Sequence, residues 1–556
     1  MPGLHPESTS GTVVCNKNNH RGNNIDQVKD IMATMADEKH AEQPTVNAIM
    51  VENTPNTQHS TTGDDSTNKT GWWGKLSAST QYAVVYITFI FLSLFARLMR
   101  ADISDGGTPV FDEKHYAVQA RQMMFNAGNL ENYPGYGLVV HPPLGKWLIS
   151  LGQYVGGYTP LGWRLSSIIA GVIIVVAIIR IIQLATSGSI AAMIAAGLVA
   201  NMEGTQLVMS KMAMLDVFLA LFVTIMAWCI MEDYHRDNTV TPFHQRWWLL
   251  GSGIAAGLAM GVKVSGVFYP ALAGILMVVI VALSSKNVRT TAKAFGMGLV
   301  FYMVVPVCVT ILTWLPWFNQ ENSVYRHIAE AGRIEHELPG WLSSWLPDSI
   351  NSFMSYQIGV MKFHTKLQSG VGFDNIHPWE SKPDQWILSA SRPMLFLDTD
   401  PSGQPLFGSG ESSEKFYLVG NVAVWYLIIP MVLFGLYKLI TTRSMPWLII
   451  LSGIALGTIP WAINYDRQQY FFYVTQFSMF MIIGVILMIY QVSGMVAKKA
   501  YPLSHQEVAR VLLSCYVFVV AVVFILYVPW MYSLHVPNWY HEMLELWDSW
   551  KILEKY

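Results

Sequence analysis

Long apolar runs separated by short polar connections dominate the chain after about residue 75. A run of about 20 apolar residues matches the roughly 30 Å hydrocarbon core of a bilayer. We predict eleven membrane-spanning helices, which start near Tyr82, Gly162, Ser189, Met212, Trp247, Gly266, Ala294, Val419, Pro446, Tyr470 and Val511. The third and fourth, and the fifth and sixth, are short and are separated by very tight turns. The pattern predicts an all-α polytopic membrane protein.

Composition agrees with this prediction and narrows the function. The 556 residues are 52% hydrophobic and only 13% charged, whereas soluble proteins carry about 25% charged residues. The net charge of -2 gives no indication of a nucleic-acid partner. The four cysteines form no CxxC pair, so neither a disulfide framework nor a thiolate metal site is indicated.

Positive charges in the short connections predict the orientation of the spans. Four connections carry Lys and Arg, at residues 236–246, 286–293, 438–443 and 498–510, and such connections are typically cytoplasmic. We therefore predict three parts: a disordered cytoplasmic tail at 1–75, rich in Asn, Thr and Ser; a transmembrane domain at 76–533; and an external C-terminal segment at 534–556.

Two long segments, at 102–158 and 319–418, are expected on the external side. Both are rich in Trp, His, Pro and acids, and long loops of this kind usually carry function. Interface anchoring by tryptophan is typical of membrane proteins. The candidate anchors of the second segment are Trp317, Trp341, Trp345, Trp379 and Trp386.

The first external segment contains the most concentrated chemical signal. It holds Asp112 and Glu113 in VFDEKHY, followed by His141 and Lys146 in HPPLGK. One carboxylate can take the proton from a hydroxyl that attacks an anomeric carbon. A leaving phosphate then needs cations for stabilisation, and this set of residues suits sugar transfer from a lipid phosphate. An Asp-Glu dipeptide is also typical of ordinary loop or helix-cap acids, and spacing alone leaves that alternative open.

From about Trp73 onward, the chain resembles the bacterial (actinobacterial) protein O-mannosyltransferases. The resemblance rests on motifs in a specific order: VFDEKHYAVQA, HPPLGKWLI, Gly162-Trp163-Arg164, MSKMAMLDVF, GLAMGVKVSG, FHTKLQSG, HPWESKP and DRQQYFFYVTQF. FHTKLQSG followed by HPWESKP is the part most specific to the bacterial branch. Eukaryotic relatives carry a β-trefoil (MIR) domain in the large loop, where this chain has only about 100 residues, so no MIR domain is expected.

The resemblance implies a C-type glycosyltransferase fold, an inverting mechanism and a polyprenyl-phosphate mannose donor. It further implies that Asp112 is the general base and that Glu113 orients the acceptor or the donor. Arg164 matches an arginine linked to the donor phosphate, and Arg97 matches a second functional arginine less securely. The implied acceptors are Ser and Thr of secreted or membrane proteins, met at the Sec translocon.

Further charged residues lie at the external ends of spans. Asp216 is costly within an apolar span and is a functional candidate, although pairing with Lys211, about one turn away, is an equal alternative. Lys263 and Arg467, in external turns, either bind the lipid phosphate, as the resemblance favours, or end helices. The external histidines show no i, i+4 zinc spacing, so no metal site and no obligatory cofactor are predicted. A divalent cation beside the phosphate is a further option.

Two other interpretations of the chain were weighed. A C-type transferase that modifies a lipid or a cell-envelope glycan would carry a similar Asp-Glu and HPPLGK set, and only FHTKLQSG and HPWESKP separate it from a protein mannosyltransferase. A transporter or scaffold would place polar groups near mid-membrane and often shows repeats between its halves. The clustering of acids and cations in external segments argues against that second class.

Overall fold

The computed structural model describes residues 72–545, apart from 105, 126–139, 237–244, 286, 322, 335–337, 368, 370–378, 387–393, 397–411 and 500–502. Of the predicted tail at 1–75, all but Trp72–Lys75 lies outside the described residues, as do 546–556 of the predicted C-terminal segment.

Nine helical stretches of the described chain are long and apolar enough to cross a membrane, and two shorter apolar helices accompany them. The long ones are α2 (Ala78–Leu98), α5 (Pro160–Ala185), α8 (Leu215–His235), η5 with α10 (Val264–Val267, Phe268–Ser285), α11 with η6 and α12 (Val288–Leu299, Val300–Val304, Val305–Thr313), α17 with α18 (Val422–Trp425, Ile428–Thr442), α19 (Met445–Ile463), η7 with α20 (Phe471–Val474, Thr475–Ala497) and α21 (His505–Tyr532). The short ones are α6 (Ile190–Met202) and α9 (Trp247–Val262). All eleven predicted spans correspond to apolar helices, nine of them long enough to cross a membrane, and each starts within about six residues of its expected position.

Local sequence signals explain where several spans begin. The Ser77 side chain caps α2, and the Thr159 side chain caps α5 ahead of Pro160 in its first turn. Ser504 and Glu507 form a capping box at the start of α21. Each cap satisfies backbone N–H groups that the first helical turn leaves without partners.

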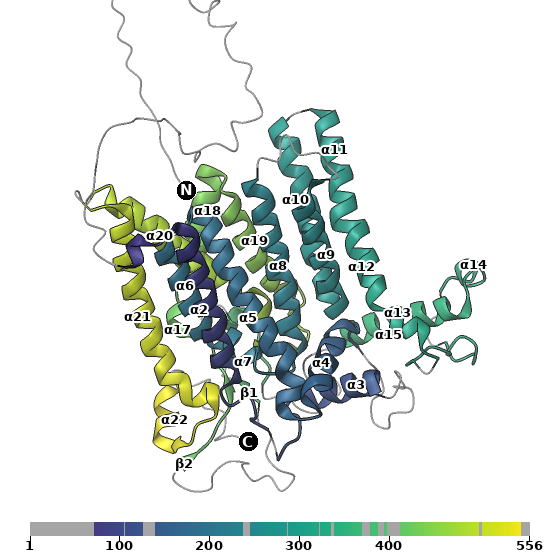
Figure 1. The fold of residues 1–556 in the computed structure, drawn as a ribbon. Coiled ribbons are helices and arrows are strands. Elements are labelled where there is room, and N and C mark those ends of the chain that lie inside the picture. The colour runs from purple at the N-terminus through teal and green to yellow at the C-terminus, as the bar shows by residue number, and fades with distance from the viewer. Residues whose placement is uncertain are drawn as a thin grey trace, which may run out of the picture. The chain divides into compact units, whose positions relative to one another are not determined.

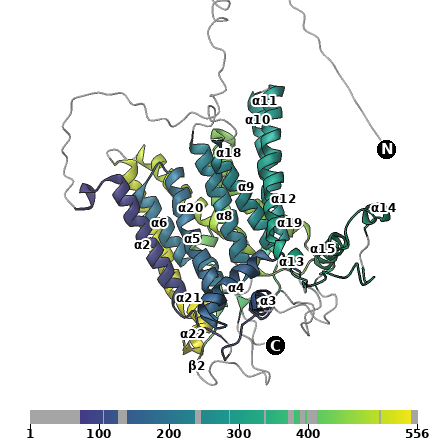
Figure 2. The same cartoon turned by 45° about the vertical axis from the view of Figure 1, so that its right-hand side comes forward.

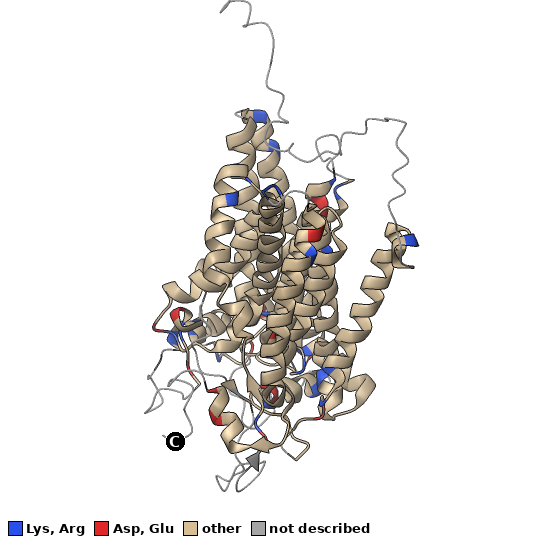
Figure 3. Ribbon diagram, turned by 90° about the vertical axis from the view of Figure 1, so that its left-hand side faces the viewer, with Lys and Arg blue, Asp and Glu red and all other residues tan. Residues whose placement is uncertain are grey.

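The centre of the bundle consists of α5, α8 and α20, as Figure 2 shows from a second angle. Their most apolar stretches are 61%, 83% and 61% buried, whereas those of the other long spans are only 17–28% buried. A helix that is apolar on all sides and still exposed is suited to lipid contact. Most charged residues coloured in Figure 3 lie toward the two ends of the bundle, and few lie along its middle. These features identify a multi-pass membrane protein.

The elements outside the spans gather mainly at one end of the bundle, opposite the turn between α10 and α11 (Figure 1). The helices outside the spans are η3 (Trp73–Lys75), α3 (Glu113–Phe125), α4 (Leu144–Gly156), α7 (Gly204–Met209), α13 (Leu315–Asn319), α14 (Gly340–Ser343), α15 (Asp348–Lys366), α16 (Pro383–Trp386) and α22 (Asn538–Leu544). Two-residue strands pair antiparallel: β1 (Met394–Leu395) with β3 (Tyr417–Leu418), and β2 (Ser412–Ser413) with β4 (Val536–Pro537).

The tryptophans of the second segment do not share one environment. Trp317 and Trp386 are buried within the protein, so the expectation that they anchor the segment at the membrane interface is wrong. Trp317 belongs to an aromatic cluster that fixes α15 to the end of α12, and the Trp386 indole donates to Ser381 Oγ. Trp341 and Trp345 are 73% and 86% exposed and stay candidates for anchoring.

Candidate active site

Asp112 stands at the entrance to α3, behind a residue with an unusual backbone. Phe111 has φ of 49°, in the left-handed region, which costs a non-glycine residue on the order of 1–3 kcal/mol. Its ring packs against Phe396 and Phe472, at centroid distances of 5.5 and 5.9 Å. These contacts hold the turn that presents Asp112.

Glu113, the other acid of the pair, is fully buried and forms an ion pair with Arg164 of α5. Its two carboxylate oxygens accept from Arg164 Nε at 2.8 Å and Nη2 at 2.7 Å. They also accept from the backbone N–H groups of Val110 and Ala213. Arg164 Nη1 donates to two backbone carbonyls, those of Ala101 and Ile103.

This arrangement bears on two expectations. Glu113 was expected to orient the acceptor or the donor, and Arg164 was expected to bind the donor phosphate. In the structure each is engaged by the other and by backbone groups, and both are almost inaccessible to solvent. The pair joins α3, α5 and the turn before α8, which makes it a support for the site.

The Asp112 carboxylate, in contrast, accepts no hydrogen bond from any residue that the structure describes. Its removal from water raises the pKa of Asp112 to about 6, an effect that Lys263 opposes and Asp216 reinforces. A carboxylate with this pKa is ionised at neutral pH and is matched to proton transfer there. Of the two acids, Asp112 is therefore the one available as a base.

Asp216, in the first turn of α8, pairs with Lys263 at the end of α9. Lys263 Nζ lies 2.9 Å from both Asp216 carboxylate oxygens. The alternative in which Asp216 pairs with Lys211 is wrong, because α8 begins only at Leu215 and Lys211 lies in the turn before it. The buried Lys211 ammonium instead lies 3.8 Å from the ring centroid of Tyr532.

Lys263 also faces aromatic rings from the start of the tenth span. Its ammonium lies 5.7 Å from the ring centroid of Phe472 and 5.4 Å from that of Tyr473. Cations are attracted to the faces of such rings. Lys263 thus lies between Asp216, the rings of Phe472 and Tyr473, and the surroundings of Asp112.

His141, His364 and Lys146 form a wall of the site near Lys263. The rings of His141 and His364 lie 5.4 Å apart, and Lys146 Nζ donates to the His141 carbonyl at 3.2 Å. Burial lowers the pKa of Lys146 to about 7. Burial and the neighbouring charges of Lys263 and Lys146 also hold the pKa of His141 well below its usual range.

Arg467 lies far from His141 and Lys146 in the sequence but contacts the same wall. It donates from Nη2 to His364 Nδ1 at 3.3 Å and from Nη1 to Tyr473 Oη at 3.0 Å. His364 Nε2 lies 3.0 Å from the Val140 carbonyl, which only accepts, so Nε2 carries the proton and Nδ1 is free to accept from Arg467. The cations Lys146, Lys263 and Arg467 therefore surround one pair of neutral histidines.

Arg97 is placed elsewhere, inside the bundle. It is fully buried and donates to Ser210 Oγ at 2.7 Å, to Asn201 Oδ1 at 2.7 Å and to the Ser93 carbonyl. These partners lie on α2, on α6 and just after α7. The contacts are those of a packing residue, and the structure does not bring Arg97 to the Asp112 group.

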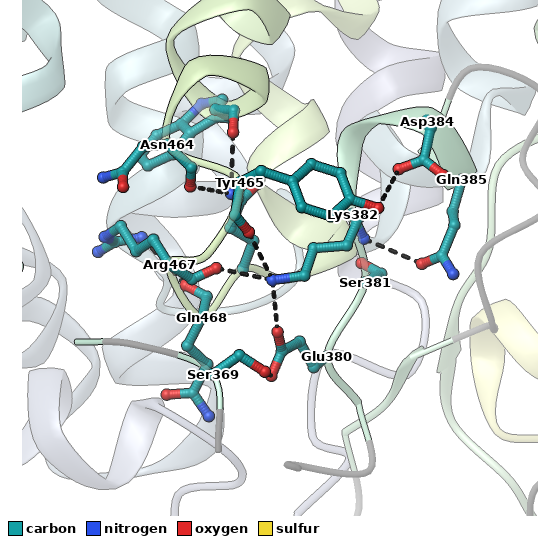
Figure 4. Close-up of polar contacts among 12 residues, drawn as sticks. Ser369, Glu380, Ser381, Lys382, Asp384, Gln385, Asn464, Tyr465, Arg467 and Gln468 are labelled. Atoms are coloured by element: carbon teal, nitrogen blue, oxygen red, sulfur yellow. Dashed lines mark hydrogen bonds and ion pairs between the residues drawn. The ribbon is translucent and has the colours of Figure 1, made fainter. Parts of the chain in front are cut away.

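The HPWESKP motif lies only partly within the described residues, because His377 and Pro378 are outside them. Of the described part, Ser381 and Lys382 bond to the loop that carries Arg467, and Figure 4 shows the Lys382 contacts. These contacts hold the described part of the motif against that loop.

Sequence reasoning missed the aromatic residues that complete the site. Tyr473 accepts from Arg467, and Phe111 and Phe472 pack against each other next to Asp112. The DRQQYFFY motif was the available signal, but a run of aromatics at the start of a span is usually interpreted as packing. Within the described ranges, no group of three or more His, Cys, Asp or Glu residues is arranged to hold a metal ion.

The chain is similar to known proteins in sequence and in fold. A sequence model of the family described as dolichyl-phosphate-mannose-protein mannosyltransferase matches residues 140–314. The polyprenol-phosphate-mannose–protein mannosyltransferase of Corynebacterium glutamicum is 34% identical over 507 residues, which cover 86% of this chain and 94% of the relative. The protein of the same name from Mycolicibacterium smegmatis is 34% identical over 443 residues, covering 75% of this chain and 83% of the relative.

Among solved structures, the chain is similar to a Saccharomyces cerevisiae protein O-mannosyltransferase complex bound to the sugar donor. The TM-score is 0.62 at 13% identity, and the match covers 85% of this chain and 93% of the yeast chain. This likeness confirms the C-type glycosyltransferase fold that the sequence predicted.

Proposed function

Because this chain belongs to the polyprenol-phosphate-mannose–protein mannosyltransferases, we propose that it transfers mannose from a polyprenyl-phosphate carrier to protein acceptors. The acceptor groups are Ser and Thr hydroxyls. The single observation that carries the mechanism is the Asp112 carboxylate, which is free of hydrogen bonds within the described residues and lies in the electrostatic reach of Lys263.

In the proposed reaction, Asp112 takes the proton of the acceptor hydroxyl while the hydroxyl oxygen attacks the anomeric carbon of mannose. The bond between that carbon and the phosphate oxygen breaks, and the electron pair leaves with the phosphate. Attack from the face opposite the phosphate inverts the anomeric centre. The polyprenyl phosphate then remains as the lipid product.

Three cations are arranged to hold the donor phosphate. Lys263 and Arg467 make the first contacts, and Lys146 adds to the local positive potential around His141. Charge-assisted bonds of this kind are strong where water is excluded. Lys263 is bound to Asp216 in the present structure, so we propose that its ammonium is shared between that carboxylate and the phosphate when donor binds. No obligatory cofactor is assigned to this step, and a divalent cation is tested below.

We further propose that the site lies on the external side and the N-terminus on the cytoplasmic side. Asp216 is at the start of α8 and Arg236 follows its end, so the site and that basic connection lie at opposite ends of the helix. The same reasoning applies to α19, which runs from the connection at 438–443 to the loop of Arg467. This orientation would let acceptors be met as they leave the Sec translocon.

The test is a transfer assay in membranes that contain the protein. Radiolabelled polyprenyl-phosphate mannose and a Ser/Thr-rich peptide are supplied to wild type, Asp112→Asn and Asp348→Asn, with and without EDTA. Asp348 is an exposed acid at the start of α15 and controls for the substitution itself. We expect label in the peptide from wild type and Asp348→Asn, and a fall of about 10²–10⁴-fold for Asp112→Asn.

The other outcomes are equally informative. Label that enters a lipid or glycan fraction instead of the peptide would overturn the protein acceptor. Equal label from wild type and Asp112→Asn, at equal accumulation, would remove Asp112 as the base. Loss of transfer in EDTA that magnesium restores would show that a divalent cation takes part.

A further inference from the structure

The loop that carries Arg467 is held from outside by two stretches of the second long segment. We call residues 464–470 the Arg467 loop; it connects α19 to η7. Leu367 and Ser369 bond to it, through Gln468 N to Leu367 O at 3.1 Å and Ser369 N to Asp466 O at 2.9 Å. Residues 380–381 bond to it through Ser381 N to Gln469 O at 2.9 Å and a bridge between Glu380 and Tyr470.

Lys382 is the side chain that completes this grip, as Figure 4 shows. Its ammonium donates to the backbone carbonyl of Tyr465 at 2.8 Å and to that of Arg467 at 2.9 Å. It also forms an ion pair with Glu380 Oε1 at 2.7 Å. Lys382 thus makes two hydrogen bonds to the loop and one charge contact with Glu380, whose Oε1 is not in hydrogen-bond geometry.

Glu380 is fixed in turn, which makes the arrangement specific. Its other carboxylate oxygen accepts from Ser369 Oγ at 2.9 Å. The Glu380 side chain is 4% exposed and that of Lys382 is 16% exposed, so solvent screens the pair weakly. Ser369, Glu380 and Lys382 therefore join both stretches of the segment to the same loop.

The backbone and the guanidinium of Arg467 are held separately. Lys382 holds the main-chain carbonyl of Arg467, while His364 and Tyr473 hold the side chain. His364 comes from FHTKLQSG and Lys382 from HPWESKP. Both motifs of the second segment thus converge on one arginine, although neither contributes a contact to Asp112 that the structure describes.

We propose that Lys382, oriented by Glu380, is a positioning residue that sets the Arg467 guanidinium for the phosphate of the lipid donor. The proposal rests on the function proposed above, in which Arg467 binds that phosphate. In this proposal Lys382 does not touch the donor. It fixes the carbonyls of Tyr465 and Arg467, and with them the stretch of backbone that carries the Arg467 side chain. Misplacement of a binding group by about 1 Å can cost on the order of a hundredfold in rate.

The experiment measures transfer kinetics with polyprenyl-phosphate mannose as the varied substrate. The variants are Lys382→Met, Lys382→Arg and the control Lys293→Met, an exposed lysine of α11 outside both motifs. We expect Lys382→Met to raise KM for the donor at least tenfold, with a smaller change in KM for the acceptor peptide. Lys382→Arg, which keeps the charge and the donors, should recover most of the loss, and Lys293→Met should behave as wild type.

A double-variant cycle separates positioning from a general effect on folding. If Lys382 acts through Arg467, then Lys382→Met should cost little further activity in an Arg467→Ala background. Equal losses in both backgrounds would overturn the proposal, as would a Lys382→Met variant with an unchanged donor KM. Absence of peptide labelling by wild type would instead refute the proposed function, which keeps the two failures distinct.

Discussion

Two ion pairs flank Asp112, and they differ in how completely the protein encloses them. The pair of Glu113 and Arg164 is 0% and 1% exposed, and backbone N–H groups and carbonyls fill its remaining positions. The pair of Asp216 and Lys263 is 3% and 11% exposed, and the further neighbours of its ammonium are the faces of two aromatic rings.

This difference separates a support from a binding group. A buried charged group whose hydrogen-bonding positions are all filled is not stabilised further by a ligand. Its removal leaves its partner unpaired in a low dielectric. An ammonium with one carboxylate partner and partial access can accept a phosphate as a second anion. Adjacent residues such as Asp112 and Glu113 can therefore have unrelated roles, one in chemistry and the other in holding the turn.

The largest expected effect is on the enclosed pair. Arg164→Met leaves Glu113 buried without its counter-charge, which should destabilise the fold by about 3–5 kcal/mol. Thermal unfolding of the purified protein in detergent measures this loss. The double variant Glu113→Leu/Arg164→Met should be more stable than Arg164→Met alone, because replacing a whole buried pair by apolar groups is often tolerated. An Arg164→Met protein that unfolds like wild type but no longer binds donor would reverse the assignment.

A smaller effect, on substrate use, is expected at the second pair. Lys263→Met should raise KM for the lipid donor by about ten- to a hundredfold, because one charge-assisted bond of about 1.5–3 kcal/mol is lost. Lys263→Arg should restore part of this loss. The measurement is donor saturation in the transfer assay, with folded protein quantified in each sample. If Lys263→Met lowers stability as much as Arg164→Met and leaves KM unchanged, the two pairs are alike and the comparison fails.

The smallest effect is a shift in the pH profile. In the proposed mechanism transfer requires ionised Asp112, so activity should rise with pH through about 6, the pKa of Asp112, and then level off. Lys263 lowers that pKa and Asp216 raises it. Lys263→Met should therefore move the rising limb to higher pH, and Asp216→Asn should move it to lower pH. Profiles of kcat/KM for the three proteins check the two directions, and limbs that coincide would place Asp112 outside the reach of this pair.

The sequence predicted the spans well because about 20 apolar residues are needed to cross a bilayer, whatever the tertiary structure. It also singled out Asp112, Lys263 and Arg467 by residue type and resemblance. It could not assign partners: Glu113 meets Arg164 and Asp216 meets Lys263 across 51 and 47 residues of chain. Spacing suggested Lys211 for Asp216, and the break before α8 made that inference fail.

Burial was the second property that the sequence left open. Trp317 and Trp386 look like interface tryptophans in the sequence, and the fold buries both. Arg97 looks like a ligand and packs inside the bundle against Ser210 and Asn201. In each case the outcome depends on which helix lies beside the residue, and a periodic pattern along one helix carries no such information.

The two short apolar helices, α6 and α9, have a consequence for the surrounding lipid. Helix α6 has 13 residues and α9 has 16, which at 1.5 Å per residue gives about 20 and 24 Å, less than the roughly 30 Å of bilayer hydrocarbon. Such hydrophobic mismatch is met by local thinning of the membrane or by tilting of its neighbours. Lys263 directly follows α9, so a thinned membrane there would lower the water boundary to the level of the reacting groups. A lipid-borne sugar and a water-borne polypeptide would then meet at one depth.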